Sequence, residues 1–178
     1  MRTLDDFRFD WVARCLHWGM AVPLLGMVGW GYYSANLNFY DPMYHRALYW
    51  HRSMGVVLFG AFLIRTAWRL GHPPAPLPEV MPAWQRHAAF LTQLGLYLFM
   101  FLLPVTGYVT STSDGRGVDV FGWWELPAWL PPNSGRETWM GTIHGMAAIL
   151  FCLVVVIHIT AALKHHFIHR DGIFRRMW

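Results

Sequence analysis

The sequence predicts an all-α integral membrane protein, a four-helix bundle with both termini in the cytoplasm. Only 13% of its residues are charged and 55% are hydrophobic, whereas soluble domains carry about 25% charged residues. Four long apolar runs occupy most of the chain, and its length suits one helical domain, residues 1–178. The basic residues are dispersed and form no patch or stripe, so we expect no nucleic-acid partner.

The apolar runs give four expected membrane spans, at about 13–35, 49–68, 87–110 and 139–164. The fourth is the clearest, because residues 143–163 contain no Asp, Glu, Lys or Arg, and about twenty such residues cross the hydrocarbon core of a bilayer. In the first span, Pro23 introduces a kink of the kind that membrane helices tolerate. Arg65 and Arg69 close the second span and are expected to reach the lipid headgroups.

The connectors between the spans differ in character. Residues 71–84 are rich in proline and predict a stiff, extended segment without helix. The longest connector, residues 111–138, is rich in tryptophan, and we expect it to lie as an amphipathic lid on the membrane surface. The segment after the fourth span is basic and aromatic, which is typical of a segment that lies on an anionic lipid leaflet.

The basic residues orient the four spans, because an even number of spans places both ends of the chain on one side. That side is expected to carry ten Lys and Arg residues: Arg2, Arg8, Arg14, Arg65, Arg69, Arg86, Lys164, Arg170, Arg175 and Arg176. The other side is expected to carry four: Arg46, Arg52, Arg116 and Arg136. Cytoplasmic loops carry the excess of Lys and Arg, so both termini are expected in the cytoplasm.

Four histidines lie inside the expected spans. His144 and His158 are fourteen residues apart, nearly four helical turns, so they share a face and lie roughly 21 Å apart along the helix. With the topology above, His51 lies near the outer surface with His144, and His17 lies toward the inner surface with His158. A polar group inside a membrane usually faces a partner within the bundle, so this arrangement indicates two ligand sites.

Two opposed imidazoles suit the iron of haem b, which favours two haem sites, His17 with His158 and His51 with His144. Zinc or copper would draw on a fuller set of cysteine, carboxylate or histidine ligands at one depth. Covalent attachment of haem would need a C-x-x-C-H motif, which is absent, and a proton relay would normally recruit an intramembrane carboxylate. Structural histidines that bond to neighbouring carbonyls are the remaining alternative.

Further residues are expected to lie near these sites. Arg52 follows His51 directly and would either pair with a haem propionate or anchor the helix to headgroups. Arg65 and Lys164 are weaker candidates for the same role at the inner site. Several glycines would allow a porphyrin or a neighbouring helix to approach closely, namely Gly19, Gly55, Gly107 and Gly145. No residue is singled out as catalytic.

Five segments resemble the prokaryotic cytochrome b561 family over nearly the whole chain. They are ARCLHW at 13–18, YWHRSMG at 49–55, LLPVTGY at 102–108, IHGMAA at 143–148 and HITAALKHHFIHRDGIFRRM at 158–177. The resemblance implies a four-helix protein of the bacterial inner membrane with two haem b groups, whose ligands correspond to His17, His51, His144 and His158. Many members carry a histidine in the third span where this chain has Gln93.

The resemblance also implies electron transfer, and one branch of the family oxidises superoxide and reduces ubiquinone. We therefore expect a superoxide:ubiquinone oxidoreductase or, as the alternative, a cytochrome b subunit or shuttle between the quinone pool and a redox partner such as a hydrogenase or dehydrogenase. A non-haem structural membrane protein is the weakest alternative. The outer side offers an anion little net attraction, because five acidic residues offset its four arginines: Asp41, Asp114, Asp119, Glu125 and Glu137.

Overall fold

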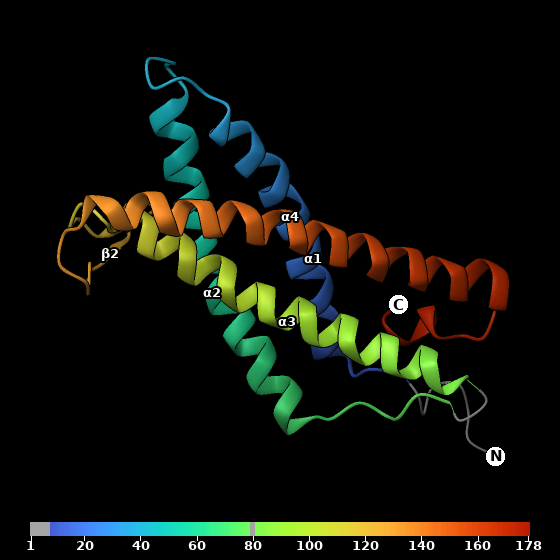
Figure 1. The fold of residues 1–178 in the computed structure, drawn as a ribbon. Helices are drawn as coiled ribbons and strands as arrows, with labels where there is room; N and C mark the ends of the chain where they lie inside the picture. The colour runs from blue at the N-terminus through green and yellow to red at the C-terminus, as the bar shows by residue number, and fades with distance from the viewer. Residues whose placement is uncertain (1–7, 79–80) are drawn as a thin grey trace.

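A computed structural model describes residues 8–78 and 81–178 of the chain (Figure 1). Within these residues it contains four helices that are long and apolar enough to cross a membrane: α1 (Trp11–Ala35), α2 (Tyr44–Gly71), α3 (Ala83–Ser111) and α4 (Ser134–Lys164). A π-helical turn, η2 (His165–His169), continues α4, and a short 3-10 helix, η3 (Phe174–Arg176), follows. The expected all-α four-helix membrane fold is confirmed.

Each helix is longer than the span expected for it, chiefly at its start. Two of the helices begin at polar capping residues, which extends them beyond the apolar run. The carboxylate of Asp10 accepts a hydrogen bond from the backbone N–H of Ala13 at 2.9 Å. The side chain of Asn133 likewise accepts from the N–H of Arg136 at 3.1 Å. Such caps satisfy backbone donors that the first turn of a helix leaves without partners.

The helices pack as two close pairs, α1 with α2 and α3 with α4, and α2 also lies against α3. In Figure 1, α3 and α4 run side by side, whereas α1 and α2 cross them at a steeper angle. The buried apolar core is small: Met20, Ala47, Leu58, Phe62, Met81, Val118, Val120, Ala147 and Phe151. Most large apolar side chains on the helices are exposed, as expected for a bundle whose outer surface is covered by lipid.

The connectors agree with the sequence in part. Residues 73–78 of the proline-rich connector contain neither helix nor strand, as predicted. The long connector instead forms an antiparallel hairpin, β1 (Val118–Val120) with β2 (Trp124–Leu126), which the sequence did not predict because strands of three residues give little periodic signal. In β1 the burial alternates, which agrees with an amphipathic segment.

The hairpin is held on the N-terminal half of α2 by one buried serine. The hydroxyl of Ser53 donates to the carbonyl of Asp119 at 3.0 Å and accepts from the N–H of Phe121 at 3.3 Å. The ring of Phe121 packs edge-on against Trp50, with centroids 5.1 Å apart. The Trp-rich connector is therefore a structured cover over this half of α2.

The two ends of the described chain meet at the opposite end of the bundle (Figure 1). The N–H of Phe9 donates to the carbonyl of Arg176 at 3.0 Å, and the indole N–H of Trp18 donates to the carbonyl of Met177 at 2.8 Å. Both ends of the described chain therefore lie on one side of the four helices. Arg2, one of the ten basic residues assigned to this side, lies outside the described residues.

Candidate functional site

The first histidine pair lies toward the end of the bundle where the chain ends meet. His17 on α1 faces His158 on α4, with ring centroids 6.3 Å apart and ring planes at 68°. Both side chains are half-buried. We refer to this pair as the inner pair.

The second pair lies toward the end that carries the hairpin. His51 on α2 faces His144 on α4, with ring centroids 6.2 Å apart and ring planes at 87°. These side chains are half-buried as well, and we refer to them as the outer pair. The two pairs that the sequence predicted are thus brought together at two depths.

The separation within each pair fits one metal ion held between two imidazoles. A ring nitrogen lies roughly 1.2 Å from its ring centroid, so two rings bound at about 2 Å on opposite sides of a metal place their centroids about 6.4 Å apart. The observed 6.3 and 6.2 Å agree with this value. A direct hydrogen bond between two imidazoles would bring the rings closer, because the two nitrogens would then lie about 2.9 Å apart.

The helices that carry each pair are not the ones that pack closely. Each pair joins α4 to α1 or α2, whereas the close helix contacts are those of α1 with α2, of α3 with α4 and of α2 with α3. The histidines therefore face one another between elements whose backbones are held apart. This arrangement fits a planar group such as a porphyrin between them.

On the outer side, α3 holds His144 in a defined tautomer. The Nδ1 atom of His144 lies 3.0 Å from the carbonyl oxygen of Leu103, which can only accept, so Nδ1 carries the proton. The hydroxyl oxygen of buried Thr106 lies 3.1 Å from the same nitrogen. This leaves the lone pair on Nε2, the arrangement that a metal-binding histidine needs.

Two glycines allow the outer imidazoles to lie where they do. A Cβ atom added at Gly31 on α1 would lie 2.9 Å from Cε1 of His51, and one added at Gly107 on α3 would lie 3.1 Å from Cε1 of His144. Both distances are shorter than an ordinary contact between carbon atoms. At Gly107 a side chain of the neighbouring helix α4 approaches closely, as expected; Gly19, Gly55 and Gly145 would meet no atom within 4 Å, and the approach of a porphyrin to them stays a prediction.

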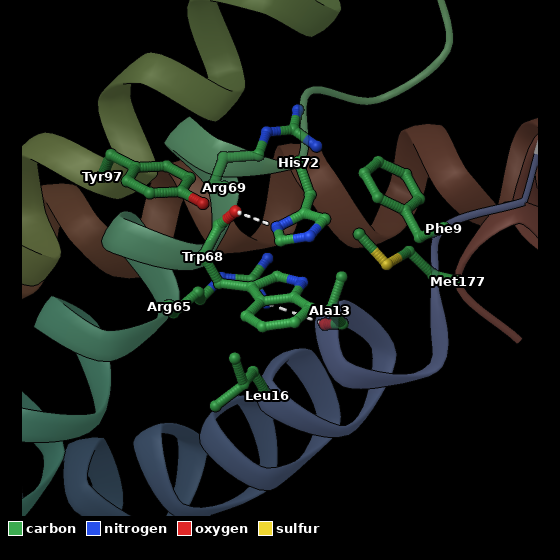
Figure 2. Close-up of a pocket in the computed structure, with 9 residues that line it drawn as sticks. All are labelled: Phe9, Ala13, Leu16, Arg65, Trp68, Arg69, His72, Tyr97 and Met177. Atoms are coloured by element: carbon green, nitrogen blue, oxygen red, sulfur yellow. Dashed lines mark hydrogen bonds between the residues drawn. The ribbon is translucent and has the colours of Figure 1, made fainter.

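On the inner side, a cation lies beside the histidine. The guanidinium of Arg65 lies 3.4 Å from Nδ1 of His17, and it also donates to the carbonyl of Ala13 at 3.3 Å. Arg65 therefore turns toward α1. Figure 2 shows Arg65 and Tyr97 at the edge of a small cavity of about 10 Å³, room for about one water molecule.

The outer arginines are placed unequally. Arg52 is exposed at the outer end of α2, and no residue in the described part of the chain forms a hydrogen bond or ion pair with it. Arg116 pairs with Asp114 at 2.6 Å, and hydrogen bonds from Arg116, the backbone one foremost, hold the pKa of that carboxyl below its usual value. Arg136 donates to the carbonyl of Pro131 at 2.9 Å. Gln93 is exposed on α3.

Sequence reasoning missed Gly31, Leu103 and Thr106 as neighbours of the outer pair, and the contact of Arg65 with His17. The missed signal was spacing. Gly31 lies fourteen residues after His17, and Arg65 lies fourteen residues after His51, the same interval as between His144 and His158. Positions at this interval return to the same helix face, so both residues belong to the faces that carry the histidines.

The chain resembles known proteins along nearly its whole length. A family model described as prokaryotic cytochrome b561 matches residues 8–178. The chain is 37% identical over 171 residues to cytochrome b561 homolog 2 of Escherichia coli (strain K12), covering 96% of this chain and 90% of that protein. It is 30% identical over 122 residues to cytochrome b561 homolog 1 of the same organism, covering 68% and 66%. It is 25% identical over 169 residues to the probable superoxide oxidase CybB of Yersinia pestis, covering 91% and 90%.

Proposed function

The chain belongs to the prokaryotic cytochrome b561 family of membrane electron-transfer proteins, and from that membership we propose that it oxidises superoxide and reduces ubiquinone. Membership implies that it binds haem b, a one-electron carrier when bound. In the proposed reaction, each superoxide anion gives up one electron and leaves as dioxygen. Ubiquinone takes two electrons and two protons and becomes ubiquinol, so two superoxide anions are consumed for each ubiquinol formed.

We propose that the chain holds two haem groups, the inner one by His17 and His158 and the outer one by His51 and His144. The observation that carries this proposal is the pair of histidine separations, which are nearly equal and match two imidazoles on one metal. The defined tautomer of His144 supports the outer site. The two pairs lie at different depths because His144 and His158 are nearly four turns apart on one helix.

For the membrane arrangement, we propose that both termini face the cytoplasm of a bacterium and that the hairpin faces the periplasm. The family and the four apolar helices make this a multi-pass bacterial membrane protein. The excess of Lys and Arg on the side where the chain ends meet supports the orientation. The outer histidine pair would then be the one nearer to superoxide in the periplasm.

Arg52 is the residue that we propose attracts the superoxide anion. Arg116 is neutralised by Asp114 and Arg136 is bound to a backbone carbonyl, whereas Arg52 is exposed and directly follows His51. An exposed cation beside a reactive centre raises the encounter rate of an anion, and the effect falls with ionic strength. Pairing of Arg52 with a haem propionate is the second role we propose for it. The relative named as a probable superoxide oxidase supports the choice of substrate.

The second candidate is a cytochrome b subunit or shuttle that passes electrons between the quinone pool and a redox partner protein. The observation that favours it is the group of exposed aromatic side chains on the outer connector. Trp123 is 77% exposed and Trp129 is 71% exposed. Exposed aromatic surface is typical of protein interfaces, and Trp is enriched at membrane interfaces as well. Copurification of a second polypeptide in constant proportion with this chain would favour this candidate.

The proposal is tested on detergent-purified protein by adding a superoxide source, with and without ubiquinone, and recording the reduced haem band and ubiquinol. We expect reduction of the haem and accumulation of ubiquinol, and we expect His51→Ala to abolish both. His87→Ala is the matched control, because His87 is exposed at the start of α3 and belongs to neither pair. Haem that stays oxidised in the presence of superoxide would refute the proposed reaction and leave the partner protein as the function to pursue.

A further inference from the structure

Three helices repeat the same interval between the two depths of the bundle. On α1, His17 and Gly31 are fourteen residues apart. On α2, His51 and Arg65 are fourteen residues apart, and on α4 the interval separates His144 from His158. Because α1 and α2 run in opposite directions, His17 meets Arg65 at the inner depth and Gly31 meets His51 at the outer depth. The two histidine pairs thus lie at the two ends of the same fourteen-residue interval on α4, and the intervals on α1 and α2 join the same two depths.

The two sites differ in the residue that lies fourteen positions from a paired histidine on α1 or α2. At the inner depth, α1 and α4 supply the paired histidines and α2 supplies the residue behind one imidazole. At the outer depth, α2 and α4 supply the pair and α1 supplies that residue. At the outer depth that residue is Gly31, which adds no charge and no polar side chain. At the inner depth it is Arg65, whose guanidinium lies 3.4 Å from Nδ1 of His17.

Among the described residues, no carboxylate pairs with Arg65. The groups around its guanidinium include the carbonyl of Ala13, the imidazole of His17 and the ring of Tyr97, whose centroid lies 6.0 Å away (Figure 2). Arg69 and His158 also lie close enough to interact with its charge. The carboxylate of Asp10 is engaged elsewhere, by Ala13 N–H at 2.9 Å and by the indole of Trp68 at 3.0 Å.

At the outer site the group behind the imidazole of His144 is a carbonyl oxygen, which carries partial negative charge. The proton on Nδ1 of His144 points at the carbonyl of Leu103, and such a bond makes an imidazole a stronger electron donor to a metal. A ligand of this kind favours the oxidised metal. Arg52 is the cation nearest in sequence to the outer pair, but it is exposed, and solvent and salt screen its field.

We propose that Arg65 tunes the inner haem site so that it is reduced more easily than the outer site, which directs electrons inward. This rests on the proposed function for the two haem sites. A fixed positive charge near an iron disfavours the ferric state, which carries one more positive charge than the ferrous state. This effect raises the reduction potential of the inner site.

The test is an equilibrium redox titration of purified protein, followed by the optical and electron paramagnetic resonance signals of each haem. Arg65→Gln is compared with Arg65→Lys, which keeps the charge, and with Arg69→Gln, which removes a cation one turn further along α2. Two single-haem backgrounds assign the signals: His51→Ala leaves the inner site and His17→Ala leaves the outer site. Arg65→Met is a second neutral variant that keeps the packing of the aliphatic stem.

In the inner-site background we expect Arg65→Gln to lower the equilibrium constant for haem reduction about fiftyfold, which is about 100 mV for a one-electron couple. The estimate follows from removing a unit charge roughly 7 Å from the metal at an effective dielectric constant of about 20. We expect Arg65→Lys to change the constant by less than about threefold, because it keeps the charge, and Arg69→Gln to change it less than Arg65→Gln does, because Arg69 lies further from His17. In the outer-site background Arg65→Gln is expected to have no effect.

Equal effects of Arg65→Gln and Arg69→Gln on the inner haem, or no effect of either, would overturn the proposal. So would loss of the inner haem in both neutral variants with retention in Arg65→Lys, because Arg65 would then be needed for binding and not for tuning. The potentials are measured without superoxide, so they test this proposal even if the proposed reaction fails. Absence of haem from the unmodified protein would refute the proposed function, and this proposal with it.

Discussion

Replacement of Gly31 by alanine tests whether the outer histidine pair binds a haem. The added Cβ would lie 2.9 Å from Cε1 of His51. Carbon atoms in ordinary contact are about 3.5 Å apart, so the imidazole must move by roughly 0.5 Å. Metal sites tolerate ligand displacements of about 0.2 Å, so a displacement of this size is expected to disrupt binding between His51 and His144.

The same substitution does not by itself destabilise the helix. Replacing glycine by alanine inside a helix favours the helical state by roughly 0.5–1 kcal/mol, so loss of haem could not be blamed on a weaker α1. Gly29→Ala is the matched control, because it makes the same change on the same helix and its added Cβ would meet no atom within 4 Å. Gly107→Ala is the intermediate case, since its Cβ would lie 3.1 Å from Cε1 of His144.

The assay is the ratio of haem to protein in purified samples, measured by pyridine haemochrome absorbance. We expect about two haems per chain in the unmodified protein and in Gly29→Ala, about one in Gly31→Ala and an intermediate value in Gly107→Ala, following the contact distances. Full haem content and an unchanged spectrum in Gly31→Ala would show that His51 is not a ligand in the arrangement described here. Equal loss in Gly29→Ala would show that any substitution on this stretch of α1 has the same effect.

Three further predictions follow from single contacts. Thr106→Val removes the hydroxyl beside Nδ1 of His144 and is expected to lower haem affinity at the outer site about tenfold. Thr110→Val should leave the affinity unchanged, because its hydroxyl bonds only within α3. Haem titration of the apoprotein measures both. Ser53→Ala removes the hydroxyl that bonds to the part-buried carbonyl of Asp119 and N–H of Phe121, at a cost of about 1 kcal/mol. Hydrogen exchange at Val118–Val120 should therefore accelerate, unlike in Ser34→Ala, whose hydroxyl bonds within α1. The hydrogen bond from the backbone N–H of Ala13 is the main cause that lowers the pKa of Asp10 below its value in the unfolded chain. Asp10 therefore stabilises the fold at pH values above its unfolded pKa, and this contribution is lost as the pH falls through the folded pKa. Asp10→Ala should therefore lower the melting temperature at pH 7, by an amount corresponding to about 1 kcal/mol, and the difference from the unmodified protein should disappear in acid.

The four helices could be predicted from the sequence because a membrane imposes a simple rule on composition. A span needs about twenty residues without charge, and residues 143–163 satisfy it completely. The helix ends could not be predicted as well, because they depend on polar caps such as Asp10 and Asn133 outside the apolar runs. The hairpin was missed because its strands have only three residues each and because Ser53, which holds it, is 66 residues away in sequence.

The candidate site was predictable to the extent that it depends on residue type. A histidine in an apolar span is conspicuous, and its depth follows from the span, so the two pairs could be formed on paper before the structure brought them together. The groups behind the histidines were not conspicuous. A glycine or a backbone carbonyl inside a span has many possible roles, and only coordinates show that Gly31 meets His51 and that the carbonyl of Leu103 meets His144.

The fourteen-residue interval explains why the two sites look alike in sequence and differ in structure. The interval also occurs on α3, where Thr92 and Thr106 are fourteen residues apart. Of these two threonines, only Thr106 has a described hydrogen bond to a paired histidine. At Thr106, α3 lies close enough to α4 for the carbonyl of Leu103 to reach His144 as well. A repeat in the sequence therefore fixes where a residue lies along and around its helix, but the spacing between helices decides what it touches. The two histidine pairs thus acquire different surroundings, a carbonyl at one depth and a guanidinium at the other, which is the difference that the proposed inward electron transfer needs.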